Sequence, residues 1–197
     1  MPKVQETGGT KELISAWSHI VRLVQIIDLW TQKFEWKGEE KEARKISLTF
    51  EFPNLPYEYE DKQGNKKTWV KVKSNEFTLS RSEDANLKKF IELRLGEQKL
   101  WKDWIEIWDW LWKAWLWVIQ YTTSKKGKVY DNLEAVMPMM IGMEAPAPVR
   151  QLSYFDLDNY DASLFDSLPS WIQDKIRLSP EYQAVAWNVP SEEPMPF

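Results

Sequence analysis

Basic and aromatic side chains are interleaved in three segments of the chain, and this pairing is what single-stranded nucleic acid requires of a binding surface. Cations contact the phosphates, and aromatic rings stack on the bases without reading their sequence. For each aromatic residue the alternative is core packing, and for each lysine it is a solvated surface position. Recurrence in three segments favours binding, so we predict contacts from Lys33, Phe34, Trp36, Lys37, Arg44, Lys45, Tyr57, Tyr59, Lys66, Lys67, Trp69, Lys71, Lys73, Tyr121, Lys125, Lys126, Lys128 and Tyr130.

Catalytic chemistry is poorly represented. The 197 residues include no cysteine and one histidine, His19, which we interpret as a structural or surface residue. The HExxH, GxxxxGK, GxGxxG and GxSxG motifs of metal, phosphate, dinucleotide and acyl-transfer sites do not occur. Acidic residues at 39–42 are interleaved with lysine, which is typical of a solvated hairpin. We therefore expect a binding protein without catalytic residues, metal or cofactor.

Hydrophobic periodicity predicts the elements that position these side chains. A run of β-branched residues at 19–29 predicts a strand, and strict alternation at 46–52 predicts a second that Pro53 ends. Ser80 and Glu83 have the spacing of a capping box at the start of a helix. In order, we expect strands at 19–29, 46–52 and 69–79, a charged hairpin loop around Gly38 at 31–44, a second loop at 53–67, a helix at 83–95, and two strands around a turn at 124–128.

The predicted element order is β-β-β-α-β-β, which is that of a mainly β, five-stranded OB-fold barrel. This fold commonly binds oligonucleotides or oligosaccharides, and the loops between strands 1 and 2 and between strands 4 and 5 flank its binding face. Basic and aromatic residues fall on those connections. An SH3-like barrel and a β-sandwich are the alternatives.

The charge is unevenly distributed and divides the chain. Residues 145–197 carry three basic and eight acidic residues, a net charge of −5, whereas residues 1–144 carry +1. We predict a flexible arm at 1–16, a binding domain at 17–143, and a Pro/Ala linker with an acidic tail at 144–197. No run of apolar residues is long enough to cross a membrane.

A short helix is predicted in the tail, because Pro169 and Pro180 follow residues that suit helix starts. Leu168, Trp171, Ile172 and Ile176 would line one face of it. That face can dock on the chain's own body or on a partner.

Three runs resemble a family of tailed-phage single-stranded DNA-binding proteins: VQIIDLWTQKFEWKGEEKEARKISLTFEFP, NEFTLSRSEDANLKKFIELRLG and WLWVIQYTTSKKGKVYDNLEAVMP. The segment FDLDNYDASLFDSLPSWIQDKIRLSPEYQA resembles the tail of such proteins. The closing EEPMPF is similar to the acidic tip of bacterial single-stranded DNA-binding proteins, which ends in Pro-Phe.

The resemblance implies an OB-fold that coats single-stranded DNA during phage replication or recombination in the cytoplasm of a bacterial host. It also implies that a tip of Glu192, Glu193, Pro196 and Phe197 recruits replication and recombination enzymes. Self-association is expected, since single-strand binders of this fold often assemble. Two alternatives stay open: a protein-binding adaptor or anti-defence factor on the same scaffold, and a small nuclease.

Tryptophan is unexpectedly abundant: the chain has 13 Trp and only 7 Gly. Trp17, Trp30 and Trp112 stand where the resemblance leads us to expect glycine. We hypothesise that these positions are encoded by UGA codons, which the source organism reads as glycine and which are written here as tryptophan. Other candidates are Trp187 and some of Trp101, Trp104, Trp108, Trp115 and Trp117. The alternative is a genuine aromatic belt for DNA stacking or self-association.

Overall fold

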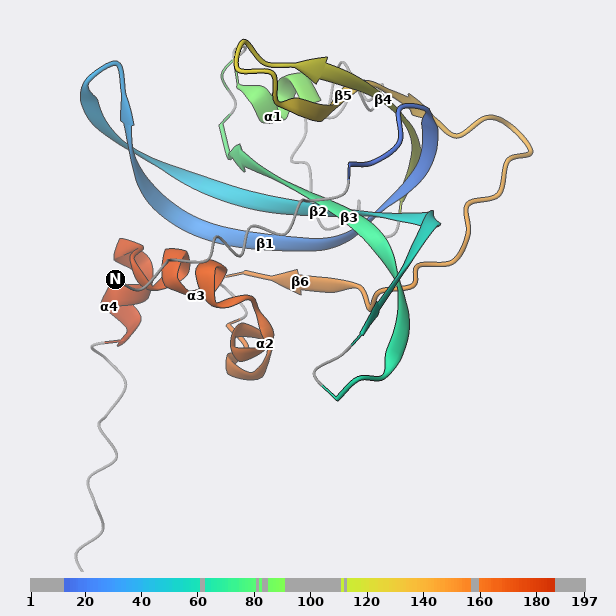
Figure 1. Ribbon diagram of the computed structural model, residues 1–197. Helices are drawn as coiled ribbons and strands as arrows, with labels where there is room; N and C mark the ends of the chain where they lie inside the picture. The colour runs from blue at the N-terminus through green and yellow to red at the C-terminus, as the bar shows by residue number, and fades with distance from the viewer. Residues whose placement is uncertain are drawn as a thin grey trace, which may run out of the picture.

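The computed structural model describes residues 13–60, 63–80, 82, 85–90, 111, 113–156 and 160–186. Within these residues the protein is mainly β, with one sheet and a few short helices (Figure 1). The strands are β1 (Ser18–Trp36), β2 (Glu39–Glu60), β3 (Lys66–Thr78), β4 (Ala114–Thr123), β5 (Val129–Pro138) and β6 (Ser153–Phe155). The helices are α1 (Asn86–Lys89), α2 (Ala162–Ser167), α3 (Ser170–Arg177) and α4 (Pro180–Ala186).

The sheet has the strand order β3-β2-β1-β4-β5, and neighbours in this order are antiparallel. β1 is its central strand. One edge of β1 pairs with β2, while the other pairs with β4 at residues 18–22 and then with β6, in parallel, at residues 25–27. The C-terminal part of the chain is therefore joined to the strand that begins the sheet.

The predicted hairpin around Gly38 is confirmed, but the loop predicted at 31–44 is too long. β1 and β2 stay paired as far as Trp36 and Glu39, and only Lys37 and Gly38 form the turn. Their φ angles are 55° and 79°, a left-handed pair whose twist matches that of the flanking strands. Lys33 faces Glu42 across the ladder, and opposite charges on facing strands stabilise their pairing. The charged residues therefore lie on the paired strands of the solvated hairpin rather than in a loop.

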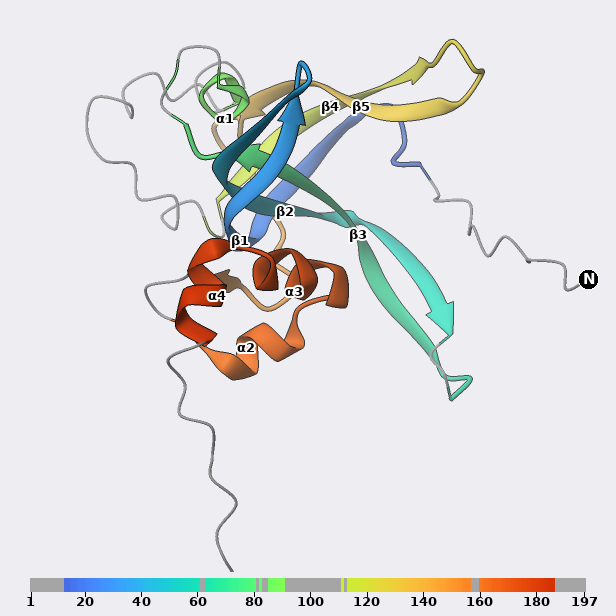
Figure 2. The same ribbon diagram turned by 90° about the vertical axis from the view of Figure 1, so that its left-hand side faces the viewer.

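The predicted loop at 53–67 is also too long. β2 continues through Pro53 to Glu60, because a register irregularity between Phe52 and Pro56 accommodates the two prolines. The connection to β3 is confined to the residues between Glu60 and Lys66. The β2–β3 hairpin consequently extends well beyond the rest of the sheet (Figure 2).

The predicted helix starts later than expected. α1 begins at Asn86, and the preceding Ala85 makes no side-chain capping hydrogen bond. Leu87 and Phe90 are buried, as their spacing predicted. The rest of the predicted helix, at 91–95, lies outside the described residues.

The main core is rich in aromatic rings. The ring of Phe50 lies 4.4 Å from that of Trp117 between centroids, and Phe52 meets the same indole edge-on at 5.8 Å. Both phenylalanines are buried, which confirms the alternating strand predicted at 46–52. The polar positions of that strand, such as Glu51, are buried as well, because the C-terminal segment covers the second face of the sheet.

The tail helices dock on β1 through a second apolar cluster, on the side seen below the sheet in Figure 1. Its buried residues are Ile27, Leu29, Trp30, Phe155, Phe165, Leu168, Ile172 and Ile176. The predicted apolar face of the tail helix therefore packs on the chain itself, except for Trp171, which is 51% exposed. None of the helices in the described ranges has the length and hydropathy of a membrane span.

Polar contacts fasten the predicted linker to the sheet. Arg22 donates hydrogen bonds to the carbonyl oxygens of Ala145 (2.9 Å) and Pro146. The carboxylate of Glu51, which is fully buried, accepts the backbone N–H groups of Val149 (2.9 Å) and Arg150 (3.1 Å). Residues 145–150 are thus held against β1 and β2.

An ion pair joins β3 to β5, the two ends of the sheet order. Lys73 Nζ lies 2.9 Å from Asp131 Oδ1, and the two side chains are only 18% and 16% exposed. The backbone N–H of Ile14 donates to the other carboxylate oxygen at 3.0 Å. Lys71 donates to the carbonyl oxygen of Leu13 at 3.1 Å. We call this contact of β3, β5 and residues 13–14 the seam.

Asp131→Asn is expected to lower the free energy of unfolding by about 2 kcal/mol, because Lys73 then loses its partner in a largely buried position. Burial raises the pKa of Asp131, but the Ile14 hydrogen bond and the Lys73 ammonium outweigh it, so the pKa lies below the ordinary 3.8. The carboxylate therefore stabilises the fold above its ordinary pKa, and this contribution is lost as the pH falls through the lowered pKa. Urea unfolding at neutral and at acid pH measures both effects.

Asp174→Asn is the matched control, because Asp174 pairs with Arg177 at 3.1 Å on the surface, with a 68% exposed side chain. Such a pair contributes about 0–1 kcal/mol. Equal losses of stability in the two variants would contradict a structural role for the seam.

Trp30, which the family resemblance places at a glycine position, has a φ angle of 59°. An aromatic residue held in this left-handed region costs about 1–3 kcal/mol of backbone strain. Its ring is nevertheless buried, with centroids 6.4 Å from Phe155 and 5.8 Å from Tyr182, while its indole N–H is buried without a hydrogen-bond partner. The backbone agrees with the glycine hypothesis, whereas the packed ring does not.

The other tryptophans divide into groups. Trp115 and Trp117 are buried against Phe50, which favours genuine tryptophan at both positions. The Trp17 side chain is 77% exposed. Such exposure of a large apolar ring is what we expect where the natural residue is a glycine. Five of the proposed glycine positions lie outside the described residues: Trp101, Trp104, Trp108, Trp112 and Trp187.

Candidate nucleic-acid interface

In the β1–β2 hairpin, acidic neighbours engage part of the predicted cation set. Lys33 Nζ lies 3.9 Å from Glu40 and 3.3 Å from Glu42. Arg44 pairs with Asp28, whose carboxylate is buried. These charges are balanced within the hairpin, which weakens its attraction for a polyanion.

The other predicted contacts of this hairpin are Phe34, Trp36, Lys37 and Lys45. Lys45 Nζ lies 4.5 Å from the centroid of the Phe34 ring, so these two predicted contacts form a pair with each other. Trp36 is 55% exposed at the end of β1, and Lys37 occupies the exposed turn. Trp36 and Lys37 are the residues of this group that a ligand reaches most directly.

The β4–β5 hairpin presents its cations without acidic neighbours in the turn. Lys125, Lys126 and Lys128 are exposed around that turn. Lys128 Nζ lies 5.4 Å from the ring centroid of Tyr130, and Tyr130 and Tyr121 are 43% and 49% exposed. This hairpin therefore offers both chemistries, cation and ring, on one accessible element.

Two predicted contacts on β3 are used within the protein. Lys71 and Lys73 bind Leu13 and Asp131 at the seam. Their ammonium groups connect the ends of the sheet, a role that the alternation of β3 did not reveal. Both lysines therefore belong to the seam.

The β2–β3 hairpin gathers three aromatic residues on one side. Tyr57 faces Trp69 across the two strands, and Tyr59 faces Lys67. Directly facing residues of an antiparallel pair share one side of the sheet, and so do alternate residues of one strand. The rings of Tyr57 and Tyr59 have centroids 6.2 Å apart. We call Tyr57, Tyr59 and Trp69 the aromatic platform. Lys66, another predicted contact, faces Glu60 on the opposite side.

Arg150 joins this platform although sequence reasoning did not assign it. Its guanidinium carbon lies 4.8 Å from the ring centroid of Trp69. Arg150 is the first basic residue after Lys128, but no periodic pattern places it beside Trp69, which lies 81 positions earlier in the chain. The contact depends on the way Glu51 holds the linker.

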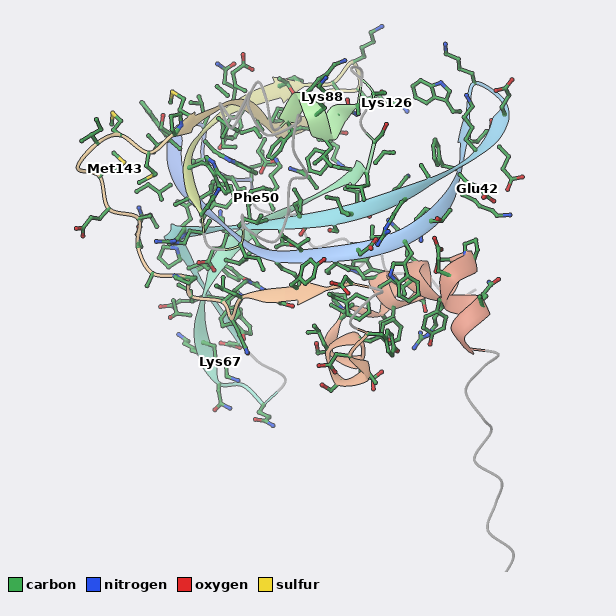
Figure 3. The ribbon with its side chains drawn as sticks, turned by 180° about the vertical axis from the view of Figure 1, so that it is seen from behind. Glu42, Phe50, Lys67, Lys88, Lys126 and Met143 are labelled. Atoms are coloured by element: carbon green, nitrogen blue, oxygen red, sulfur yellow. The ribbon has the colours of Figure 1, made fainter. Side chains whose placement is uncertain are left out.

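The three predicted groups do not form one compact patch. Figure 3 shows Lys67 of the β2–β3 hairpin far from both Lys126 of the β4–β5 hairpin and Glu42 of the β1–β2 hairpin. Figure 2 shows the β2–β3 and β4–β5 hairpins projecting from the same side of the molecule. A ligand that touches both must be an extended chain. The proposed tip at Glu192, Glu193, Pro196 and Phe197 lies outside the described residues.

A separate apolar pocket of about 690 Å³ lies beside the start of β1. Met137, Met140 and Met143 line it together with Leu55 and Leu116. Methionine side chains adapt to varied apolar partners. The pocket contains none of the predicted nucleic-acid contacts.

No protein-family model, curated protein or solved structure matches the chain. Among the described residues, no group of three or more His, Cys, Asp or Glu side chains is arranged to hold a metal ion. The functional conclusion therefore rests on the geometry of the three hairpins.

Proposed function

We propose that the protein binds single-stranded DNA with little sequence preference and coats it. The observation that carries this proposal is the aromatic platform on the β2–β3 hairpin, with Lys67 and Arg150 beside it. Rings stack on any base, and nearby cations contact the backbone, which together give sequence-tolerant binding. The exposed lysines and tyrosines of the β4–β5 hairpin extend the same chemistry along the path of the strand.

An OB-fold barrel formed by β1–β5 belongs to this proposal. Three features support it: the strand order β3-β2-β1-β4-β5, a helix between β3 and β4, and the seam where β3 approaches β5. The resemblance to tailed-phage single-stranded DNA-binding proteins leads to the same fold. We extend the proposal to self-association, to action in the bacterial cytoplasm during phage replication or recombination, and to recruitment of enzymes by Phe197 and its neighbours.

Titration with oligo-dT tests the proposed function. Tryptophan fluorescence is expected to fall as bases stack, and the affinity is expected to drop steeply when the salt concentration rises. The logarithm of the binding constant should change by about 0.7 per phosphate contact for each logarithmic unit of salt. Duplex DNA of the same composition is the control, since its bases are not free to stack. Unchanged fluorescence with no binding at low salt would refute the proposal.

A protein-binding adaptor is the second candidate, and the methionine-lined pocket favours it. In that case the Lys125, Lys126 and Lys128 side chains contribute nothing to the interaction, because the pocket lies apart from the β4–β5 turn. Replacing all three by alanine distinguishes the candidates: DNA binding weakens, and capture of an apolar partner does not.

A further inference from the structure

The backbone and the side chain of Arg150 make different contacts. Glu51 accepts the N–H groups of residues 149 and 150, so the fastening of the linker uses the backbone alone. Any residue at position 150 except proline could satisfy it. The long cationic side chain is therefore not needed to hold the linker in place.

The guanidinium lies over Trp69, and its Nε atom is buried without a hydrogen-bond partner. A guanidinium stacked on a ring keeps its N–H donors in a plane parallel to that ring, and those donors match the geometry of phosphate oxygens. A buried donor that lacks an acceptor is unfavourable. The site thus holds a guanidinium over Trp69, one ring of the aromatic platform, and its buried Nε–H makes no hydrogen bond.

We infer that Arg150 is the phosphate contact of the aromatic platform, and that Glu51 is the residue that positions it. Bases stack on Trp69 and the neighbouring tyrosines while the guanidinium binds the backbone between them. The linker is then a constituent of the DNA-binding surface rather than a spacer behind it. This inference rests on the proposed function and assigns a partner atom, the phosphate oxygen, to a residue outside the predicted set.

The experiment compares Arg150→Ala and Arg150→Lys with the unaltered protein, using oligo-dT at several salt concentrations. Arg150→Ala should weaken binding about tenfold at low salt and reduce the salt slope by about 0.7, the contribution of one phosphate on a single strand. Arg150→Lys keeps the charge but loses the planar fork, so it should retain the slope and recover only part of the affinity.

The positioning role of Glu51 is tested by a double-mutant cycle. Glu51→Gln keeps the side-chain volume but removes one of the two acceptors, so the linker loses part of its hold. It should weaken DNA binding, and adding Arg150→Ala should cause little further loss, because both changes remove the same contact. Fully additive losses would overturn the positioning role. Thermal unfolding of each variant shows how much folded protein enters the titration.

Arg177→Ala is the matched control, since its guanidinium lies 5.3 Å from the ring of Phe165 on the tail helices. It should leave both affinity and salt slope unchanged. If the unaltered protein binds oligo-dT and Arg150→Ala binds with the same affinity and slope, the inference fails while the proposed function stands. If the unaltered protein does not bind, both fail.

Discussion

Replacing Trp69 and Tyr59 together by alanine is expected to weaken binding to oligo-dT by about 100-fold at low salt. Each base–aromatic stack contributes about 1–3 kcal/mol, and every 1.4 kcal/mol is a factor of ten. Both side chains project from the β2–β3 hairpin beyond the main core, and Tyr59 is 40% exposed. The fold should therefore survive, and anisotropy of a labelled oligo-dT measures the loss.

Trp171→Ala provides the comparison. Trp171 is exposed on α3 and has Lys175 Nζ 5.4 Å from its ring centroid, so it copies the ring-and-cation pair of Trp69 at a different place. Binding should be unaffected by this change. Equal losses of affinity in Trp171→Ala and in the double variant would show that any exposed tryptophan contributes to non-specific binding. An unchanged affinity in the double variant would show that the aromatic platform does not bind DNA.

Trp117→Gly is expected to lower the free energy of unfolding by more than about 4 kcal/mol, whereas Trp30→Gly should cost about 1 kcal/mol. Trp117 is fully buried between Phe50 and Phe52, and deleting such a ring costs about 3–5 kcal/mol, with a further penalty for glycine in a strand. Trp30 loses comparable packing, but glycine at this position relieves the backbone strain at φ 59°. The indole N–H groups of Trp30 and Trp117 are both buried without a partner, so the backbone strain alone distinguishes the two positions. Urea unfolding of the two variants measures the difference.

Similar losses at the two positions would contradict a special status for residue 30. The coding question has a direct measurement as well: mass spectrometry of the peptide spanning residue 30, from protein made in its natural host, distinguishes tryptophan from glycine. A UGG codon at position 30 ends the glycine hypothesis there. A glycine would leave a space between Phe155 and Tyr182 that those rings must close.

The hydrophobic pattern of the sequence predicted where the strands lie, but it predicted poorly where they end. The alternation at 46–52 placed Phe50 and Phe52 in the core because period 2 follows directly from strand geometry. The extension of β1 to Trp36 was missed because Thr31, Gln32, Lys33 and Glu35 interrupt the apolar run that predicted the strand. Pro53 was interpreted as the end of β2, but a register irregularity lets the strand continue past it.

The sequence predicted which types of residue the candidate site contains, but not which of these residues contact one another. Facing positions such as Tyr57 and Trp69 depend on a register that the Phe52–Pro56 irregularity shifts, and no periodicity reveals it. Lys73 was taken for a ligand contact, yet Asp131 binds it across the seam. Arg150 lies over Trp69 in a distant segment whose backbone is held by a buried carboxylate, Glu51. Such contacts form between parts of the chain that carry no shared sequence signal.

The pairing of β6 with β1 has a consequence for how the chain comes apart. β1 contributes to both apolar clusters and is bordered on its second edge by β4 and β6. A chain cut after residue 143 would expose Ile27 and Leu29 to water and leave a stretch of bare strand edge open to other molecules. The two clusters should accordingly lose their amide protection against hydrogen exchange together. We therefore expect a cooperative folding unit that reaches to α4 and is larger than the five strands of the sheet.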